Sequence, residues 1–157
     1  MTESDEQINL KFNGVDIIRL SFETKKFLDN EAKINVDIKP RLFRNKNVEF
    51  SNLFKIIMEV NLFAENYFEL RFIAVGNFEL NKELDEELKK NFIDINAPAI
   101  MYPYVRSFIT TISSQMGNSL HTINIPIQFF KGELEEINSM EDNKNKINHE
   151  KDNIEYK

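Results

Sequence analysis

Apolar side chains recur at every second position through the first half of this sequence. Four runs alternate in this way: residues 8–22, 34–38, 55–62 and 68–74. A period of two places the apolar side chains on one face of a β-strand. Short turns such as residues 64–66 separate these runs and join antiparallel neighbours. The first half is therefore predicted to form a four-stranded antiparallel sheet with one apolar face.

Glycine and proline mark expected irregularities in these strands. Gly14 interrupts the first run, which predicts a bulge or bend inside one long strand. Pro40 closes the second run, and Gly76 with Asn77 closes the fourth. We therefore expect the second and fourth strands to end at these positions.

The spacing of apolar residues becomes helical after residue 80. Asn81 precedes the acidic run 83–87, a pattern typical of a short helix that Asn81 caps. A longer helix is expected to begin near Asn96, with Pro98 in its first turn, where proline is tolerated. Pro103 lies deeper and is expected to bend the helix or make its first turns irregular.

The long helix is predicted to be apolar over a wide arc, and Gly117-Asn118 is expected to end it. An arc this wide is usually covered on more than one side, so one side should rest on the sheet and the other should meet a second subunit. The stripe expected at that contact is Met101, Val105, Phe108, Ile109 and Ile112, and Ile100 and Tyr104 widen the arc.

The remainder of the chain is expected to be less regular. Residues 121–130 look extended, with Pro126 among them, and a short helix is expected over residues 132–137. From Asn138 onward the residues are polar and cannot bury enough apolar area to offset their ordering cost. The sequence thus predicts a flexible N-terminus (1–7), one domain (8–137) and a disordered tail (138–157).

Composition excludes several function classes. The net charge of −6 argues against nucleic acid as a main partner, because binding phosphates requires clustered Lys and Arg. With no cysteine, two histidines and no phosphate-binding glycine loop, we expect neither an enzyme nor a metal or cofactor site. No signal peptide or membrane-spanning run is readable, which predicts a cytoplasmic protein.

Phenylalanine is abundant, with 14 residues against no tryptophan. These rings either fill the interface between helix and sheet or form an exposed apolar groove for unfolded polypeptide. Phe129 and Phe130 are adjacent on a segment expected to be extended, so they should face opposite ways. At least one of them is therefore expected at a surface or an interface.

Residues 96–129 combine a helix start NAPAI, an aromatic run MYPYVR, a glycine stop and a P-x-x-F segment. This order resembles the SecB family of bacterial export chaperones. Residues 21–23 (Ser-Phe-Glu) and 76–78 (Gly-Asn-Phe) are similar to motifs that end the first and fourth strands of that family. The positions that match the family motif are Asn96, Pro98, Pro103, Tyr104, Arg106, Gly117 and Pro126.

The resemblance implies an α+β fold in which a four-stranded antiparallel sheet packs against a long helix, followed by a short C-terminal helix. It also implies a homotetramer, a dimer of dimers that meet through their long helices. The implied activity is ATP-independent holding of unfolded precursor proteins and their delivery to the SecA motor. The residues that would contact these clients are Phe78, Tyr102, Phe129 and Phe130.

One departure from the family pattern concerns the expected docking surface for SecA. In the family, SecA binds acidic residues on the outer face of the sheet, and Glu23 matches one of them. Arg19 and Arg71 stand where further acids would be expected, and they would oppose a basic partner. Two alternatives therefore stay open: a SecB-like chaperone dedicated to another client such as an antitoxin, and a structural oligomeric domain whose phenylalanines are all buried.

Overall fold

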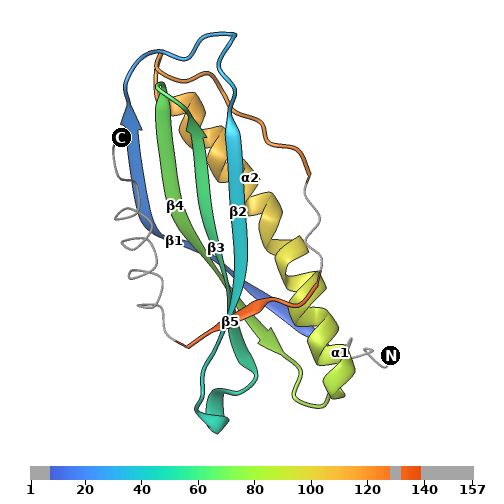
Figure 1. Ribbon diagram of the computed structural model, residues 1–157. Helices are drawn as coiled ribbons and strands as arrows, with labels where there is room; N and C mark the ends of the chain where they lie inside the picture. Colours follow the sequence, from blue (N-terminus) through green and yellow to red (C-terminus); the bar gives the residue numbers. More distant parts are fainter. Residues whose placement is uncertain (1–7, 128–131, 139–157) are drawn as a thin grey trace.

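The computed structural model describes residues 8–127 and 132–138, and in it one long helix lies across one face of a β-sheet (Figure 1). The sheet has the order β1-β4-β3-β2-β5. Its strands are β1 (Leu10–Thr24), β2 (Asn35–Arg44), β3 (Leu53–Ala64), β4 (Phe68–Leu80) and β5 (Glu135–Ile137). The first four pair antiparallel, and β5 pairs parallel to β2. The architecture is α+β, as predicted, with five strands in place of four.

The fifth strand replaces the short helix expected over residues 132–137. Glu135, Glu136 and Ile137 pair with residues 41–43 at the edge of β2. Arg41 Nε lies 3.6 Å from a Glu135 carboxylate oxygen, and Arg44 Nε lies 3.8 Å from one of Glu136. The edge of β2 offers unpaired backbone groups, and this tertiary partner outweighs the local helical pattern.

Irregularities in the strands follow the glycines only in part. Gly14 has φ +100°, and the pairing of β1 with β4 shifts between Phe12 and Val15, which confirms the predicted bulge. A second shift between Ile17 and Arg19 was not predicted. It brings both Ile17 and Leu20 onto the face of β1 that pairs with the helix-facing residues Ala74 and Phe72.

Pro40 and Gly76 lie inside their strands, so the expected strand ends are wrong. Among the described residues, the edge of β2 that points away from β3 is paired only from Arg41 onward. An edge strand tolerates the missing N–H of Pro40. Gly76 is buried beneath the helix, where an added Cβ would lie 2.8 Å from Met101 Sδ. The glycine therefore permits close approach of helix and sheet rather than ending β4.

A short 3-10 turn (Val48–Phe50) lies between β2 and β3. After β4, the chain forms one continuous helical run that consists of α1 (Glu86–Asn91), a π-helical turn (Phe92–Asn96) and α2 (Ala97–Gln115). Asp85 caps α1 by accepting a hydrogen bond from Leu88 N at 2.9 Å, so the prediction of Asn81 as the cap is wrong. Asn96 has helical dihedral angles and makes no capping bond. Pro98 lies in the first turn of α2 and Gly117, with φ +69°, follows its end, as predicted.

The core lies between α2 and the sheet. Met101, Val105 and Ile109 have 0% exposed surface, and Phe108 and Ile112 pack against the same core. The prediction that Met101, Val105 and Ile109 contact a second subunit is therefore wrong, because the chain's own sheet buries them. The part of the arc that faces outward consists of Ile100 and Tyr104, which are 38% and 53% exposed.

Candidate binding surfaces

Four side chains on one face of α2 hold an extended segment, residues 119–127, which we call the crossover segment. Tyr102 Oη donates a hydrogen bond to Pro126 O at 2.7 Å, and Arg106 Nε donates to Ile125 O at 3.0 Å. Further along the helix, Thr110 Oγ1 donates to Ile123 O at 3.2 Å, and Ser113 Oγ accepts from Ile123 N at 2.8 Å. Spacings of four, four and three residues place these side chains on one helix face. They satisfy backbone groups that would otherwise need a neighbouring strand.

We call these four side chains the clamp. While the clamp holds its backbone, the crossover segment buries three apolar side chains. Leu120, Ile123 and Ile125 are buried in the core, whereas Ile127 is 66% exposed. A hydrogen bond from Leu28 N to Ser119 O ties the start of the segment to the loop between β1 and β2. The family-motif residues Arg106 and Pro126 thus act together in positioning this segment.

Tyr102 belongs to this clamp and is 4% exposed, which contradicts its predicted role as a client-binding surface. Burial raises the pKa of the Tyr102 phenol, and the charge of nearby Arg106 partly opposes that rise. The hydroxyl therefore stays protonated and donates to Pro126 O.

Phe78 is likewise buried, at 2% exposure, so its predicted contact with clients is also contradicted. Its ring centroid lies 5.2 Å from that of Phe12 and 5.3 Å from that of Phe54. Phe12 in turn lies 4.9 Å from the ring of Tyr104. These rings fill the helix–sheet interface, the first alternative considered for the phenylalanines. Phe129 and Phe130 lie outside the described residues, and their role stays a prediction.

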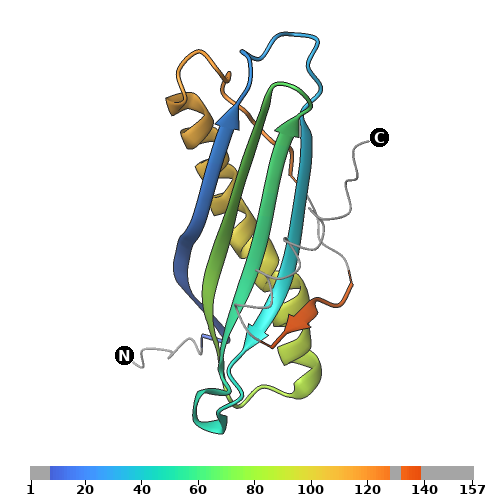
Figure 2. The same ribbon diagram turned by 60° about the vertical axis from the view of Figure 1, so that its left-hand side comes forward.

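The open edge of β1 carries the first exposed apolar surface, which we call the β1 surface. Ile17, Ile18 and Leu20 are 36%, 54% and 48% exposed. The outward face of α2 continues it, because Tyr104 contacts Phe12 of β1. Leu20 pairs with Phe72, whose ring meets Phe108 at 4.9 Å. Within the described residues, β1 pairs with β4 alone, so its other edge offers unpaired backbone groups as well (Figure 2).

A second set of exposed apolar side chains is distributed over the crossover segment, β2 and the loop that precedes β2. Its members are Phe27 in the loop between β1 and β2, Val36 on the helix-facing side of β2, and Ile127, with exposures of 68%, 42% and 66%. Among the described residues, β2 pairs with β5 only at residues 41–43, which leaves the edge at residues 35–39 open. We call this region the crossover surface.

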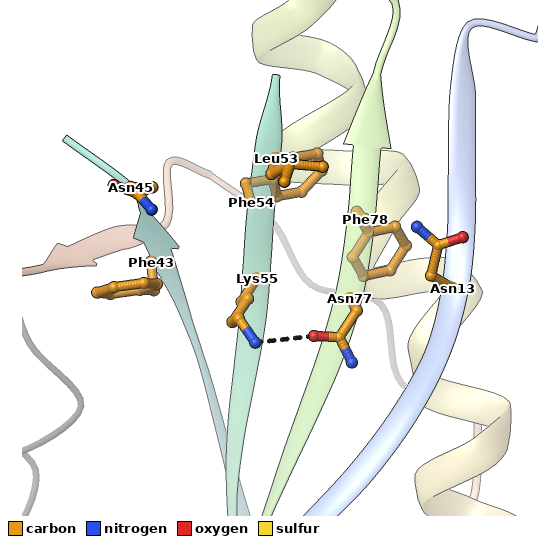
Figure 3. A pocket seen from close by; sticks show the side chains of 8 residues that line it. All are labelled: Asn13, Phe43, Asn45, Leu53, Phe54, Lys55, Asn77 and Phe78. Carbon is orange, nitrogen blue, oxygen red and sulfur yellow. Dashed lines mark hydrogen bonds between the residues drawn. The ribbon is translucent and has the colours of Figure 1, made fainter. Parts of the chain in front are cut away.

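The third feature is a small cavity of about 260 Å³ at one end of the sheet (Figure 3). Aromatic and aliphatic walls come from Phe43, Leu53, Phe54 and Phe78, and polar atoms come from Asn13, Asn45, Lys55 and Asn77. Lys55 Nζ donates to Asn77 Oδ1 at 3.0 Å, and Asn77 Nδ2 donates to Asp16 Oδ2 at 3.0 Å. These side chains satisfy one another, and the space is below the usual size of a small-molecule site.

Charges of both signs share the outer face of the sheet, where Glu23, Arg19 and Arg71 are all exposed or half-exposed. Glu23 pairs with Glu69 across β1 and β4, and Arg71 Nε lies 2.7 Å from Glu69 Oε1. The face is therefore mixed in charge rather than uniformly acidic. Over the described residues, no group of three or more potential metal ligands gathers, and no helix is long and apolar enough to cross a membrane.

Sequence comparisons agree with this arrangement. The family profile for SecB, described as preprotein translocase subunit SecB, matches residues 3–131. The uncharacterized protein MJ0357 of Methanocaldococcus jannaschii is 29% identical over 117 residues, which cover 71% of this chain and 75% of that protein. Protein-export protein SecB of Anaplasma phagocytophilum is 37% identical over 49 residues, 31% of each chain.

A solved structure shares the fold. The SecB-like chaperone Rv1957 of Mycobacterium tuberculosis, in complex with a ChAD peptide from the Rv1956 HigA1 antitoxin, aligns with a TM-score of 0.62 and 12% identity. The alignment covers 76% of this chain and 91% of that chain. Members of the SecB family are non-enzymatic holdase chaperones. Since the family profile matches nearly the whole sequence, this chain belongs to the SecB family.

Proposed function

We propose that this protein is an ATP-independent holdase that binds unfolded precursor polypeptides in the cytoplasm, keeps them export-competent and delivers them to SecA. The observation that carries the proposal is the crossover surface, where exposed apolar side chains lie beside an open strand edge. An extended client can place apolar side chains on Phe27, Val36 and Ile127 while its backbone pairs with the edge of β2. Many weak contacts along one client add up to tight binding.

Suppression of aggregation tests the holdase. A chemically denatured protein is diluted into buffer with the chaperone, and light scattering reports how much aggregates. We expect Val36→Ser with Ile127→Ser to hold clients several-fold less well than the unmodified protein. The matched control is Ile95→Ser, which removes a side chain of similar exposure, 55%, from the π-helical turn. Equal holding by all three proteins would contradict the assignment of the crossover surface.

Phe129 and Phe130 extend this proposal along the chain. We expect Phe129→Ala with Phe130→Ala to reduce client holding more than the free energy of unfolding. Equal losses of both would show that these rings serve folding instead.

The β1 surface is proposed to join subunits. Two β1 strands can pair edge to edge, and the exposed side chains of Ile17 and Leu20 would then be buried with Tyr104. Dimers formed in this way would associate further into the homotetramer. We expect Ile17→Asp with Leu20→Asp to lower the oligomeric state measured by analytical ultracentrifugation, with Ser21→Asp on the opposite face as control. An unchanged sedimentation coefficient would rule out this interface.

Delivery to SecA requires that its zinc-loaded C-terminal tail bind the outer face near Glu23. Calorimetric titration at low and moderate salt tests this step, and salt-sensitive binding is the expected result. If the tail does not bind and unfolded chains are still held, the chaperone serves another pathway. A client such as an antitoxin is then favoured, and the observation that supports this alternative is the presence of Arg19 and Arg71 on the outer face.

A further inference from the structure

The edge of β2 that points away from β3 is open over a short stretch. Among the described residues, its partner on that side is β5, which pairs with Arg41, Leu42 and Phe43. Within the same part of the chain, residues 35–39 have no neighbouring strand there, and they lead directly to the junction where β5 meets β2 (Figure 1). An open edge of this kind can take one further strand from another polypeptide.

Pro40 shows which backbone groups point toward this open edge. β2 pairs with β3 without a register shift from Asn35 to Arg44. In an antiparallel pair, successive residues direct their N–H and C=O groups alternately toward and away from the partner strand. Proline has no N–H, so it fits where that group would point away from the partner. Val36 and Ile38 lie two and four positions before Pro40, so their N–H and C=O groups also point to the open edge.

The side chains on the two sides of this edge differ in chemistry. Val36 and Ile38 lie on the helix-facing side, where Val36 is 42% exposed and Ile38 belongs to the main core. Asp37 and Lys39 lie on the outer side, with their charged groups 3.5 Å apart and both side chains more than half exposed. A strand added here would direct its side chains alternately to these two sides. Apolar side chains would thus lie beside Val36, and polar ones beside Asp37 and Lys39.

A cleft of about 340 Å³ lies at the end of the open stretch, between β2 and the residues that lead into β5. Ile38, Pro40 and Leu134 form its apolar lining, and charged side chains such as Lys39 and Glu133 complete it. Leu134 itself packs against the main core. An apolar side chain at the end of an added strand can therefore enter this cleft on the helix-facing side.

Residues 133–137 close the cleft and form an end wall for the open edge. Asp94 Oδ1 accepts a hydrogen bond from Leu134 N at 3.4 Å, and Lys90 Nζ lies 3.5 Å from Glu133 Oε1. These contacts tie the wall to the helical run, while the pairing of β5 ties it to β2. A strand that extends along β2 from its first residue must stop where it meets this wall.

We propose that the open edge over residues 35–39 selects client segments of about five residues in which apolar and polar side chains alternate. Such a segment is an amphipathic β-strand of the client rather than a uniformly apolar run. It pairs with the backbone groups of Val36 and Ile38, and its last apolar side chain enters the cleft beside Leu134. This inference rests on the proposed holdase function and specifies which part of an unfolded client binds at this edge.

Two heptapeptides of identical composition test the selection. One alternates Thr and Val throughout, and the other carries the same residues as a block of Val followed by a block of Thr. Amide NMR of the full chain reports both affinity and location. We expect the alternating peptide to bind several-fold more tightly and to slow hydrogen exchange at the Val36 and Ile38 amides, with the Leu42 amide unchanged.

A proline variant tests the edge with the peptide held constant. Val36→Pro removes one N–H that points to the open edge but keeps an apolar side chain of three carbons. We expect it to weaken binding of the alternating peptide several-fold. The matched control, Val36→Ala, keeps the N–H and should bind the peptide more tightly than Val36→Pro does. Urea denaturation checks that both variants fold, and the comparison of peptides on the unmodified chain does not depend on either variant.

The outcomes separate this inference from the holdase proposal. Equal binding of the two peptides would overturn the inference, and so would faster exchange at the Leu42 amide, because the peptide would then displace β5. If the alternating peptide does not bind while aggregation is still suppressed, the inference fails and the holdase proposal stands. If the peptide binds as expected but aggregation is not suppressed, the selective edge stands and the holdase proposal fails.

Discussion

The two faces of the sheet bury their apolar residues by different means. On the helix-facing side, strand residues such as Phe72 and Ile56 pack against Met101, Val105 and Ile109 of α2. On the outer side, Ile57, Ile73 and Val75 form a small cluster bordered by ion pairs such as Arg41 with Glu59 at 3.4 Å. The comparison shows that the helix-facing residues are covered by a second layer of structure, whereas the outer cluster is small and bordered by charged side chains.

The largest expected effect is a clash on the helix-facing side. Gly76→Val introduces a Cβ that would lie 2.8 Å from Met101 Sδ and 2.9 Å from Phe78 Cε2. We expect a loss of about 3 kcal/mol in the free energy of unfolding, measured by urea denaturation. Ser21→Val on the exposed outer side of β1 is the control and should change stability by less than about 0.5 kcal/mol. A loss below about 1 kcal/mol at Gly76 would mean that α2 can move away from the sheet.

Truncation of one isoleucine on each face compares the two clusters directly. Ile109→Ala should cost about 3 kcal/mol, since the side chain is fully buried in the main core. Ile57→Ala should cost about 2 kcal/mol in the full chain, because the same atoms are removed from a smaller cluster. A cost at Ile57 that equals or exceeds the cost at Ile109 would contradict this comparison.

The crossover segment should respond to loss of its charged clamp. Arg106→Ala removes the 3.0 Å bond to Ile125 O, and we expect a loss of about 1.5 kcal/mol. In the Arg106→Ala variant, hydrogen exchange should be accelerated more at the Ile123 and Ile125 amides than in β3. The control is Arg44→Ala, which breaks only an exposed ion pair and should cost under about 0.5 kcal/mol. Equal effects of the two changes would show that the clamp adds little.

The smallest expected effect is a pH dependence in the loop between β1 and β2. A 2.6 Å hydrogen bond from Tyr67 Oη holds the pKa of the Asp29 carboxyl below its usual value. A lowered folded-state pKa stabilises the protein above the unfolded pKa of about 4, and this contribution is lost as the pH falls through the folded value. Tyr67→Phe should therefore slightly lower the melting temperature at pH 7 and make no difference in strong acid. A difference that grows in acid would show that the sign is wrong.

The predicted elements were correct where periodicity is strong and local. The four long strands, the bulge at Gly14 and the end of α2 before Gly117 all follow from patterns within a few residues. Most of the wrong predictions concern positions where a segment distant in the sequence determines the local structure. β5 forms because the edge of β2 is available to it, and β4 continues through Gly76 beneath Met101 of α2. The wrong cap of α1 is a local error, since Asp85 bonds Leu88 three residues further on.

The candidate site was harder to predict, because exposure depends on which neighbour covers a side chain. From the sequence alone, Phe78 and Tyr102 cannot be told apart from aromatic residues at a surface, yet both are buried. The clamp of Tyr102, Arg106, Thr110 and Ser113 could have been found from its spacing of four, four and three polar positions along an otherwise apolar helix. The groups that these side chains bind could not have been found from the spacing, because they lie 10 to 24 residues away along the chain.

By itself, the sequence determined the α+β class, the strand and helix periodicities and the motifs that resemble SecB. Those features rest on the backbone geometry of a few consecutive residues. Only the tertiary structure decided that Met101, Val105 and Ile109 face their own sheet, that Ile17 and Leu20 stay exposed at an open edge, and that a second cluster forms around Ile57. Periodicity fixes the face on which a side chain lies, but the packing of distant segments fixes whether that face meets protein or water.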